Sequence, residues 1–280
     1  MSEPEHSIAG GARPTLQPPS GIRLVALDID DTLVPWQGTM SRRVADAVRA
    51  VHAKGIEIVL ATGRGVYDVV PVAEELGLDE VWALCSNGSV TARIARGDFS
   101  IHGTVTFDPR PLVAALRAID PTAPIAIESS GLGFLTDGET FDFQAPHIIG
   151  EIGQLPEAVS FLTVASAHVP VEGFATLTAE HPVRAIPYIH DGWITVDIVH
   201  ADAGKGAAVA ALAASLGIEA GDCAAMGDYL NDIPMLEWAG WSVAMGQAPD
   251  EVKAVADVVV AASAQDGAAQ ALEAIAEALR

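Results

Sequence analysis

Two aspartates at the end of an apolar run are the residues of this chain best suited to chemistry. Residues 24–27 are all apolar, as expected for a strand buried on both faces of a sheet, and Asp28 and Asp30 follow directly. Side chains two positions apart share a face of an extended chain, and two carboxylates there repel unless one is protonated or a cation lies between them. The pair therefore predicts a divalent cation site, with an Asp-rich surface turn as the plain alternative.

Further polar residues follow other apolar runs in a compatible order. Residues 56–60 form a second apolar run, and Thr62 and Gly63, just after it, offer a hydroxyl and backbone N–H groups to an anion. Lys205 lies between two glycines at the start of an Ala-rich helical segment, and Asp228 follows a further apolar run. A cation site, an anion site and a possible nucleophile at separate strand ends are what phosphoryl transfer needs.

In this order the segments resemble the four motifs of the haloacid-dehalogenase (HAD) superfamily of phosphatases. Ser86-Asn87-Gly88 after the third apolar run, and residues 243–257, resemble its Cof-like branch. The resemblance covers residues from about 22 to 88 and from about 200 to 276, and it departs at Asp31, where many relatives carry Gly. It implies an α/β fold: a Rossmann-like parallel sheet with helices on both faces, plus an inserted α+β cap domain over the active site.

The resemblance also implies roles for individual residues. Asp28 would be the nucleophile that forms an aspartyl-phosphate, and Asp30 would protonate the leaving alkoxide and then activate water. Mg²⁺ would be held by the carboxylates of Asp28 and Asp228 and by the backbone carbonyl of Asp30. The phosphoryl group would be bound by Thr62, Gly63, Lys205 and Asn231, with supporting positions at Asp232 (which would orient Lys205 or reach the metal indirectly), Asn87 and Arg64.

The predicted function is therefore a Mg²⁺-dependent phosphatase of small phosphorylated metabolites, such as sugar phosphates or a phosphorylated cofactor. Asp30 favours phosphoester hydrolysis over halide release, because a halide leaves without a proton. Three alternatives stay open: a phosphomutase of the same superfamily, a receiver-type signalling protein that only accepts a phosphate, and a binding protein on an inactive scaffold. A receiver would be a single domain of about half this length.

Composition limits the compartment and the partners. The 280 residues are 50% hydrophobic and carry a formal charge of −22, which argues against nucleic acids and anionic membranes as partners. The two cysteines lie in apolar runs and do not indicate a disulfide scaffold, so a cytoplasmic protein is expected. No run of about 18 apolar residues predicts a membrane span. The sequence gives no indication of oligomeric state.

Strand and helix patterns alternate over residues 21–88 and again over 201–280, which predicts a catalytic core built on a parallel sheet. Strands are expected near 23–28, 56–61, 81–85, 222–226, 241–244 and 257–260. Residues 89–200 have mostly short strand-like runs, including a hairpin around 96–98, and are interpreted as the inserted cap that sets substrate specificity. Hinges are expected near Gly88 and residues 201–204, and residues 1–20 as a disordered tail.

Overall fold

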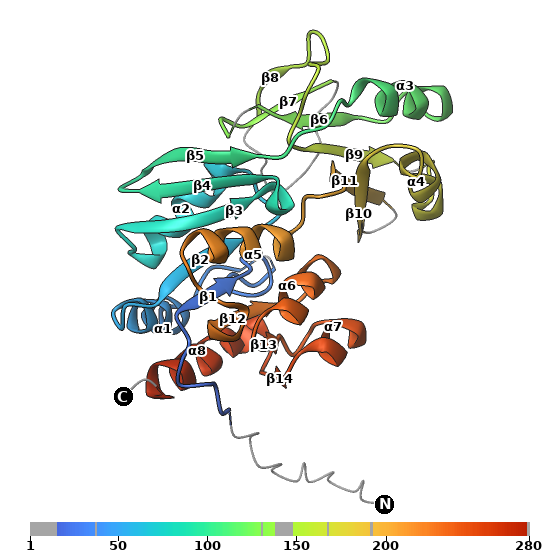
Figure 1. Cartoon of the computed structure of the whole chain (residues 1–280). Coiled ribbons are helices and arrows are strands. Elements are labelled where there is room, and N and C mark those ends of the chain that lie inside the picture. The colour runs from blue at the N-terminus through green and yellow to red at the C-terminus, as the bar shows by residue number, and fades with distance from the viewer. Residues whose placement is uncertain are drawn as a thin grey trace, which may run out of the picture.

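Two β-sheets organise the chain (Figure 1). This computed structural model describes residues 16–36, 38–129, 131–137, 148–166, 168–190 and 193–278, so most of the tail expected over residues 1–20 lies outside the described residues. Among these described residues the larger sheet has eight strands and the smaller has six, and the smaller lies above the larger in the view of Figure 1.

Six strands of the larger sheet run parallel and carry the ends that matter for chemistry. Its order is β14-β13-β12-β1-β2-β3-β4-β5, and every pair from β14 to β3 is parallel. The parallel strands are β1 (Leu24–Leu27), β2 (Glu57–Ala61), β3 (Glu80–Cys85), β12 (Cys223–Gly227), β13 (Trp241–Ala244) and β14 (Val258–Val259). This confirms the predicted α/β fold class with a parallel sheet.

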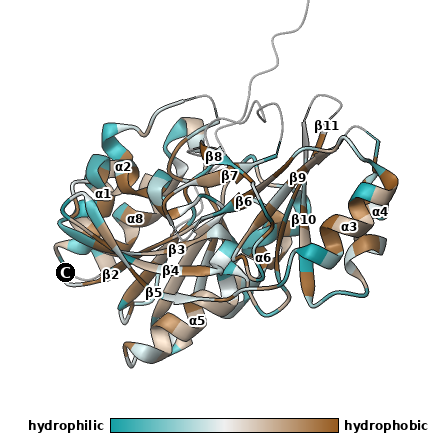
Figure 2. Ribbon diagram, turned by 90° about the horizontal axis from the view of Figure 1, so that it is seen from above, coloured by the Kyte–Doolittle hydropathy of each residue, from teal (hydrophilic) through white to brown (hydrophobic). Residues whose placement is uncertain are grey.

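Helices cover both faces of this sheet, because successive strand residues point to opposite sides. On β1, Val25 and Leu27 pack into one apolar cluster and Leu24 and Ala26 into the other, all four fully buried. One face is covered by α1 (Arg42–His52), α2 (Val66–Leu76) and α8 (Gly267–Ala278), and the other by α5 (Lys205–Ser215), α6 (Ile233–Trp238) and α7 (Asp250–Val255). The apolar strands between them appear in brown in Figure 2.

The hairpin after β3 belongs to the larger sheet, which corrects its predicted place in the insertion. Its strands β4 (Val90–Ala95) and β5 (Asp98–Thr104) extend that sheet antiparallel at the β3 edge. The predicted turn is present, with Arg96 and Gly97 at φ 53° and 80°, as a two-residue hairpin turn requires. The sequence pattern located the turn, but it contains nothing that specifies which sheet edge the hairpin joins.

The smaller sheet is built from the middle of the chain. Its strand order is β10-β11-β9-β6-β7-β8. The strands are β6 (Ile125–Glu128), β7 (Phe134–Thr136), β8 (Ile148–Glu151), β9 (Leu162–Ser166), β10 (Val183–His190) and β11 (Trp193–His200). Leu112 and Leu116 of α3 (Arg110–Ile119) and Phe174 of α4 (Val171–Thr178) pack into one apolar cluster with β6, β9 and β11. Strand β8 was not predicted.

The two expected hinges lie against each other. A Cβ added at Gly88, which has φ +84°, would lie 2.5 Å from the carbonyl oxygen of Gly204. Only glycine fits both this backbone angle and this close approach. The chain nevertheless leaves the larger sheet after β5, not at Gly88. None of the helices in the described part of the chain has the length and apolar character that crossing a membrane requires.

Candidate active site

The ends of β1 and β12 bring two of the predicted aspartates together. Leu27 pairs with Met226 in parallel register, and the backbone N–H of Asp28 donates to the carbonyl of Met226 at 3.0 Å. Asp28 and Asp228 therefore follow neighbouring strands at the carboxyl edge of the sheet. This edge is where open α/β sheets bind ligands.

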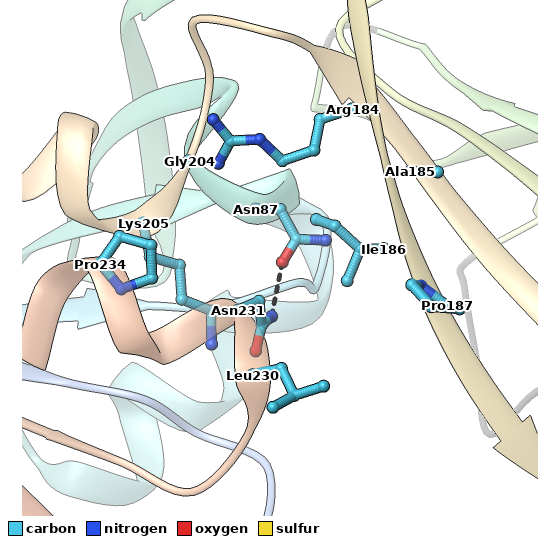
Figure 3. Close-up of a pocket in the computed structure, with 10 residues that line it drawn as sticks. All are labelled: Asn87, Arg184, Ala185, Ile186, Pro187, Gly204, Lys205, Leu230, Asn231 and Pro234. Atoms are coloured by element: carbon cyan, nitrogen blue, oxygen red, sulfur yellow. Dashed lines mark hydrogen bonds between the residues drawn. The ribbon is translucent and has the colours of Figure 1, made fainter. Parts of the chain in front are cut away.

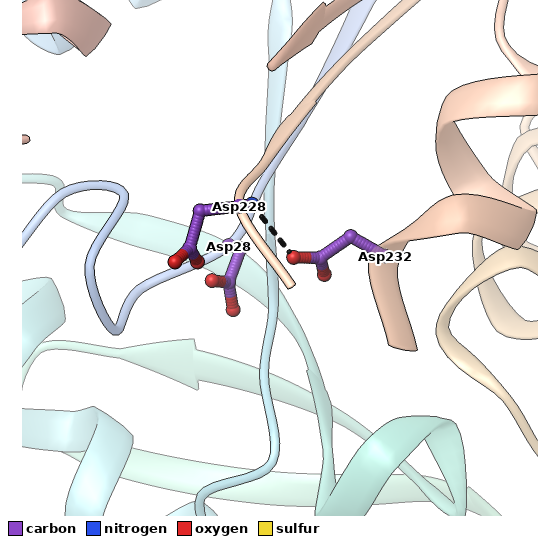
Figure 4. Close-up of side chains that lie close together, drawn as sticks. All are labelled: Asp28, Asp228 and Asp232. Carbon is purple, nitrogen blue, oxygen red and sulfur yellow. Dashed lines mark hydrogen bonds between the residues drawn. The ribbon is translucent and has the colours of Figure 1, made fainter. Parts of the chain in front are cut away.

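Lys205 bridges two buried carboxylates at this edge. Its Nζ lies 2.6 Å from Oδ1 of Asp28 and 2.6 Å from Oδ1 of Asp232. The second oxygen of Asp232 accepts the backbone N–H groups of Asp228 and Tyr229, each at 2.9 Å, and Figure 4 shows the first of these bonds. Asp232 therefore holds Lys205 and the turn after β12.

The local excess of negative charge fits a divalent cation. Asp28, Asp228 and Asp232 each offer a carboxylate oxygen, and these oxygens all lie within 4.8 Å of one another. Burial, reinforced by the charge of Asp232, raises the pKa of Asp28 well above its usual value, and burial raises the pKa of Asp228 to about 7. Both oxygens of Asp232 accept hydrogen bonds of 2.6 to 2.9 Å, whereas the bonds that Asp228 accepts from Thr32 and Gln247 are 3.5 Å long. Asp28 and Asp228 are therefore the side chains suited to hold the ion, and carboxylate oxygens suit hard cations such as Mg²⁺.

The side chain of Asp30 turns away from this cluster toward Arg64. The Nη2 of Arg64 lies 2.6 Å from Oδ1 of Asp30, and its Nε donates to both oxygens at 3.2 and 3.1 Å. The hydroxyl of Thr62 accepts the backbone N–H of Arg64 at 3.1 Å, which shapes the turn after β2. Thr62 is fully buried, and Gly63 is the next residue, at the cavity wall.

The departure at Asp31 has a structural explanation. Asp31 has φ 54°, in the left-handed region where glycine is favoured and aspartate is tolerated. Its Oδ1 accepts the backbone N–H of Trp36 at 2.6 Å, and its carbonyl accepts Nε2 of Gln247 at 2.6 Å. Aspartate at this position therefore preserves the loop and adds a bond to it.

The side chains of Asn231 and Asn87 contact each other close to Lys205. The Nδ2 of Asn231 donates to Oδ1 of Asn87 at 2.8 Å and to the hydroxyl of Tyr188 at 3.3 Å. Figure 3 shows this amide pair beside Lys205, around a small cavity of about 170 Å³. The structure thus gathers the predicted site residues at one edge of the sheet, although Asp30 and Arg64 form a separate pair at the cavity wall.

A cavity of about 850 Å³ lies between the two sheets and reaches these residues. Its floor includes Asp28, Asp30, Gly63, Arg64, Lys205, Asp228 and Asn231. Its opposite wall comes from the smaller sheet: Phe134, Phe161, Thr163, Tyr188, Thr195 and Asp197. Trp36 and Tyr67, which are 53% and 46% exposed, also line it. The cavity is large enough for a small metabolite.

Two buried acids of the smaller sheet were missed by the sequence analysis. Glu128 ends β6, and its Oε2 accepts the hydroxyls of Ser86 at 2.5 Å and Ser160 at 3.0 Å. Asp197 lies within β11 and accepts Nδ2 of Asn87 at 3.0 Å. The available signal was weaker than the one used for Asp28 and Asp30: one acid, and not a pair, within or ending an apolar strand.

Comparison with known proteins identifies the family. A model of the haloacid dehalogenase-like hydrolases matches residues 25–106 and 157–272. The chain belongs to this family. The match confirms the predicted superfamily and its Cof-like branch.

Similar proteins extend over nearly the whole chain. Phosphatase YwpJ of Bacillus subtilis is 27% identical over 90% of this chain and 99% of its own length, and pyridoxal phosphate phosphatase YbhA of Escherichia coli is 27% identical over 89% and 96%. A haloacid dehalogenase-like hydrolase structure from B. subtilis superposes with a TM-score of 0.75 at 23% identity, covering 90% of this chain and 99% of that one. The prediction of a phosphatase-type hydrolase is confirmed.

Proposed function

We propose that this HAD-family hydrolase removes the phosphoryl group from small phosphorylated metabolites with Mg²⁺ bound, through a phosphoenzyme formed on Asp28. The observation that carries the proposal is the buried Asp28, paired with Lys205 beside Asp228 at a parallel strand edge and open to the cavity between the sheets. One relative is named a pyridoxal phosphate phosphatase, and one solved structure of the same fold is that of a protein named a sugar phosphatase. Both names support a small phosphomonoester as substrate.

The chain's own groups supply the nucleophile and the acid–base residue for the two half-reactions. A carboxylate oxygen of Asp28 attacks phosphorus, the bond to the leaving oxygen breaks, and Asp30 gives that oxygen a proton. Asp30 then takes a proton from water, which attacks phosphorus and releases Asp28 and inorganic phosphate. Mg²⁺, held by Asp28, Asp228 and the Asp30 carbonyl, would supply positive charge to the phosphoryl oxygens.

The remaining site residues bind and position the phosphoryl group. Lys205 brings a positive charge next to the nucleophile, and Asp232 fixes its direction. Thr62, Gly63 and Asn231 donate to the phosphoryl oxygens in this proposal, Asn87 supports Asn231, and Arg64 orients Asp30. Preorganised donors of this kind need no rearrangement when charge develops in the transition state.

The deciding experiment is Asp28→Asn, assayed with p-nitrophenyl phosphate and Mg²⁺. Turnover should fall by about a thousandfold or more, because an amide is a poor nucleophile, while circular dichroism stays that of the wild type. Acid quenching during turnover, followed by peptide mass spectrometry, should find a phosphoryl group on Asp28 in the wild type alone. A folded Asp28→Asn variant with near-normal turnover would reject the nucleophile.

A further inference from the structure

A line of three polar side chains connects the smaller sheet with the phosphate-binding residues. Asp197 of β11 accepts Nδ2 of Asn87 at 3.0 Å, and Oδ1 of Asn87 accepts Nδ2 of Asn231 at 2.8 Å. The second bond is drawn in Figure 3. The three residues come from β11, the turn after β3 and the turn after β12, so the line crosses between the two sheets.

The chemistry of these groups gives the line a direction. An ionised carboxylate only accepts hydrogen bonds, so Asn87 must turn its NH₂ toward Asp197 and its oxygen toward Asn231. Asn231 must in turn direct its NH₂ toward Asn87. Its opposite atom, Oδ1, is buried with no hydrogen-bond partner among the described residues. The partners of the NH₂ group therefore decide the orientation of the Asn231 amide.

The middle member of the line is rigidly held. Asn87 is 1% exposed, has φ 55° and donates its backbone N–H to the carbonyl of Thr62 at 2.9 Å. Its neighbours Ser86 and Gly88 also have positive φ, at 52° and 84°. A buried side chain on so constrained a turn has no solvent to exchange its hydrogen bonds with, so it transmits the preference of Asp197.

We propose that Asp197 is a positioning residue for phosphoryl binding: through Asn87 it fixes the orientation of the Asn231 amide. One N–H of this amide donates to Asn87, and the other, which lies 3.3 Å from the Tyr188 hydroxyl in this structure, is the one offered to a phosphoryl oxygen. The inference rests on the proposed function and deepens it. Phosphoryl oxygens are acceptors, so an Asn231 amide turned the other way would present an oxygen to them and weaken binding. Because Asp197 comes from the smaller sheet, docking of that sheet and phosphate affinity are linked.

Asp197 also lines the large cavity, so the competing role for it is direct contact with the leaving group. The two roles give different results. A residue acting through Asn87 changes the affinity for inorganic phosphate, which has no leaving group. If Asp197 instead contacts the leaving group, its substitution changes the ranking of substrates and leaves the affinity for inorganic phosphate unchanged.

The test compares Asp197→Asn with wild type at pH 8 in Mg²⁺. Burial raises the pKa of Asp197 to about 7, so the carboxylate is ionised there. Calorimetric titration with inorganic phosphate should show affinity weakened about three- to tenfold, because an amide at position 197 can present either its oxygen or its NH₂ to Asn87 and no longer fixes the orientation that Asn231 needs. KM for p-nitrophenyl phosphate should rise by a similar factor, with kcat changing less. The control is Asp120→Asn, which alters another buried cap acid, bonded to Ser166 and Thr122, and should leave both constants unchanged.

A double-variant cycle isolates the path through Asn87. Asn87→Gly keeps a residue that tolerates positive φ and should weaken phosphate binding as Asp197→Asn does. Adding Asp197→Asn to Asn87→Gly should cause no further loss, whereas independent effects would add. Additive losses, or wild-type phosphate affinity in either single variant, would overturn the inference.

If Asp197→Asn does not fold, Asn87→Gly alone still tests the inference. Wild-type phosphate affinity in Asn87→Gly would show that Asn87 does not connect Asp197 with phosphate binding. Failure of the proposed function has a separate signature. Wild-type protein that neither binds inorganic phosphate nor hydrolyses p-nitrophenyl phosphate would reject the function and this inference together. A normal wild type with an unaffected Asn87→Gly variant would reject the inference alone.

Discussion

Lys205 is a single cation among three buried or nearly buried carboxylates. It lies 2.6 Å from oxygens of Asp28 and Asp232, and it is itself 3% exposed. One positive charge cannot offset three negative ones in a low-dielectric interior, which is why the pKa values of Asp28 and Asp228 are raised by burial and by neighbouring acids. This excess of negative charge is expected at a site that binds a divalent cation.

The rate loss caused by substituting Asp30 should be larger for a basic leaving group, which departs only with a proton, than for one that departs as a stable anion. In single-turnover experiments, Asp30→Asn should slow alcohol release from an alkyl phosphate about a hundred- to ten-thousandfold. Release of p-nitrophenol should slow far less, because this anion leaves unprotonated. The neutral amide can still bond to Arg64, which limits changes in the loop. Equal losses for the two leaving groups would contradict the acid role.

Ionisation of the Asp197 carboxyl should lower the stability of the fold at neutral and alkaline pH. Its pKa is raised from 3.8 to about 7 by burial, so the folded state binds the proton more tightly than the unfolded state. The unfolding free energy therefore falls as pH rises from about 4 to about 7, by as much as about 4 kcal/mol, and is level above that. Asp197→Asn stays neutral, so its Tm relative to wild type should be higher at pH 8 than at pH 5. A Tm difference that does not change with pH would contradict this.

At the scale of elements, glycines allow the helices to approach the site closely. Gly206 lies in the first turn of α5, and a Cβ there would lie 2.6 Å from the backbone of Pro234 at the start of α6. The backbone of a packed helix cannot move aside as a flexible side chain can. The position of Lys205, one residue earlier, therefore depends on this contact.

Gly206→Ala should destabilise the protein and weaken the site. Alanine favours a helix by about 1 kcal/mol over glycine, but overpacking against Pro234 costs about 1 to 3 kcal/mol, so a net loss is expected in urea unfolding. KM should rise because α5 shifts and carries Lys205 with it. Gly103→Ala, on exposed β5 with nothing within 4 Å, is the matched control. If Gly206→Ala were as stable and as active as Gly103→Ala, α5 and α6 would be shown to move apart without cost, and this prediction would be wrong.

The core elements could be predicted because their signals are local. Apolar runs placed β1, β2 and β13 to within about two residues. The sheet edge joined by β4 and β5 could not be predicted, since a hairpin pattern has no information about its partner strand. Strand β8 was missed as well.

The same distinction applies to the site. The local sequence is enough to recognise Asp28, Lys205 and Asp228, because each is a charged residue next to an apolar or glycine-rich segment. The bond from Asn87 to Asp197 joins residues 110 positions apart and depends on how the two sheets dock. Side-chain pairings of this kind are fixed by tertiary packing, so a single sequence leaves them open.

At the scale of the whole molecule, the smaller sheet is predicted to confer selectivity on a chemistry that the larger sheet performs. The chain leaves the larger sheet after β5 and returns at α5, and Val105 and Ala203 pack in one apolar cluster at the crossing. Residues 107–201 can therefore be replaced by a short Gly/Ser linker. The proposed nucleophile, acid and metal-binding residues lie outside the replaced segment, whereas one wall of the cavity lies within it.

The shortened protein should keep measurable hydrolysis of p-nitrophenyl phosphate, whose leaving group needs little help. Its KM should rise, because the wall that excludes water and the link from Asp197 to Asn87 are both lost. Rates for different natural phosphomonoesters should converge, since Phe134, Phe161 and Tyr188 no longer bound the leaving group. Circular dichroism and a cooperative unfolding transition must first establish that the protein is folded. A folded protein with the substrate ranking of the full chain would place selectivity on the larger sheet, with Trp36 and Tyr67 at the cavity wall as the residues to examine.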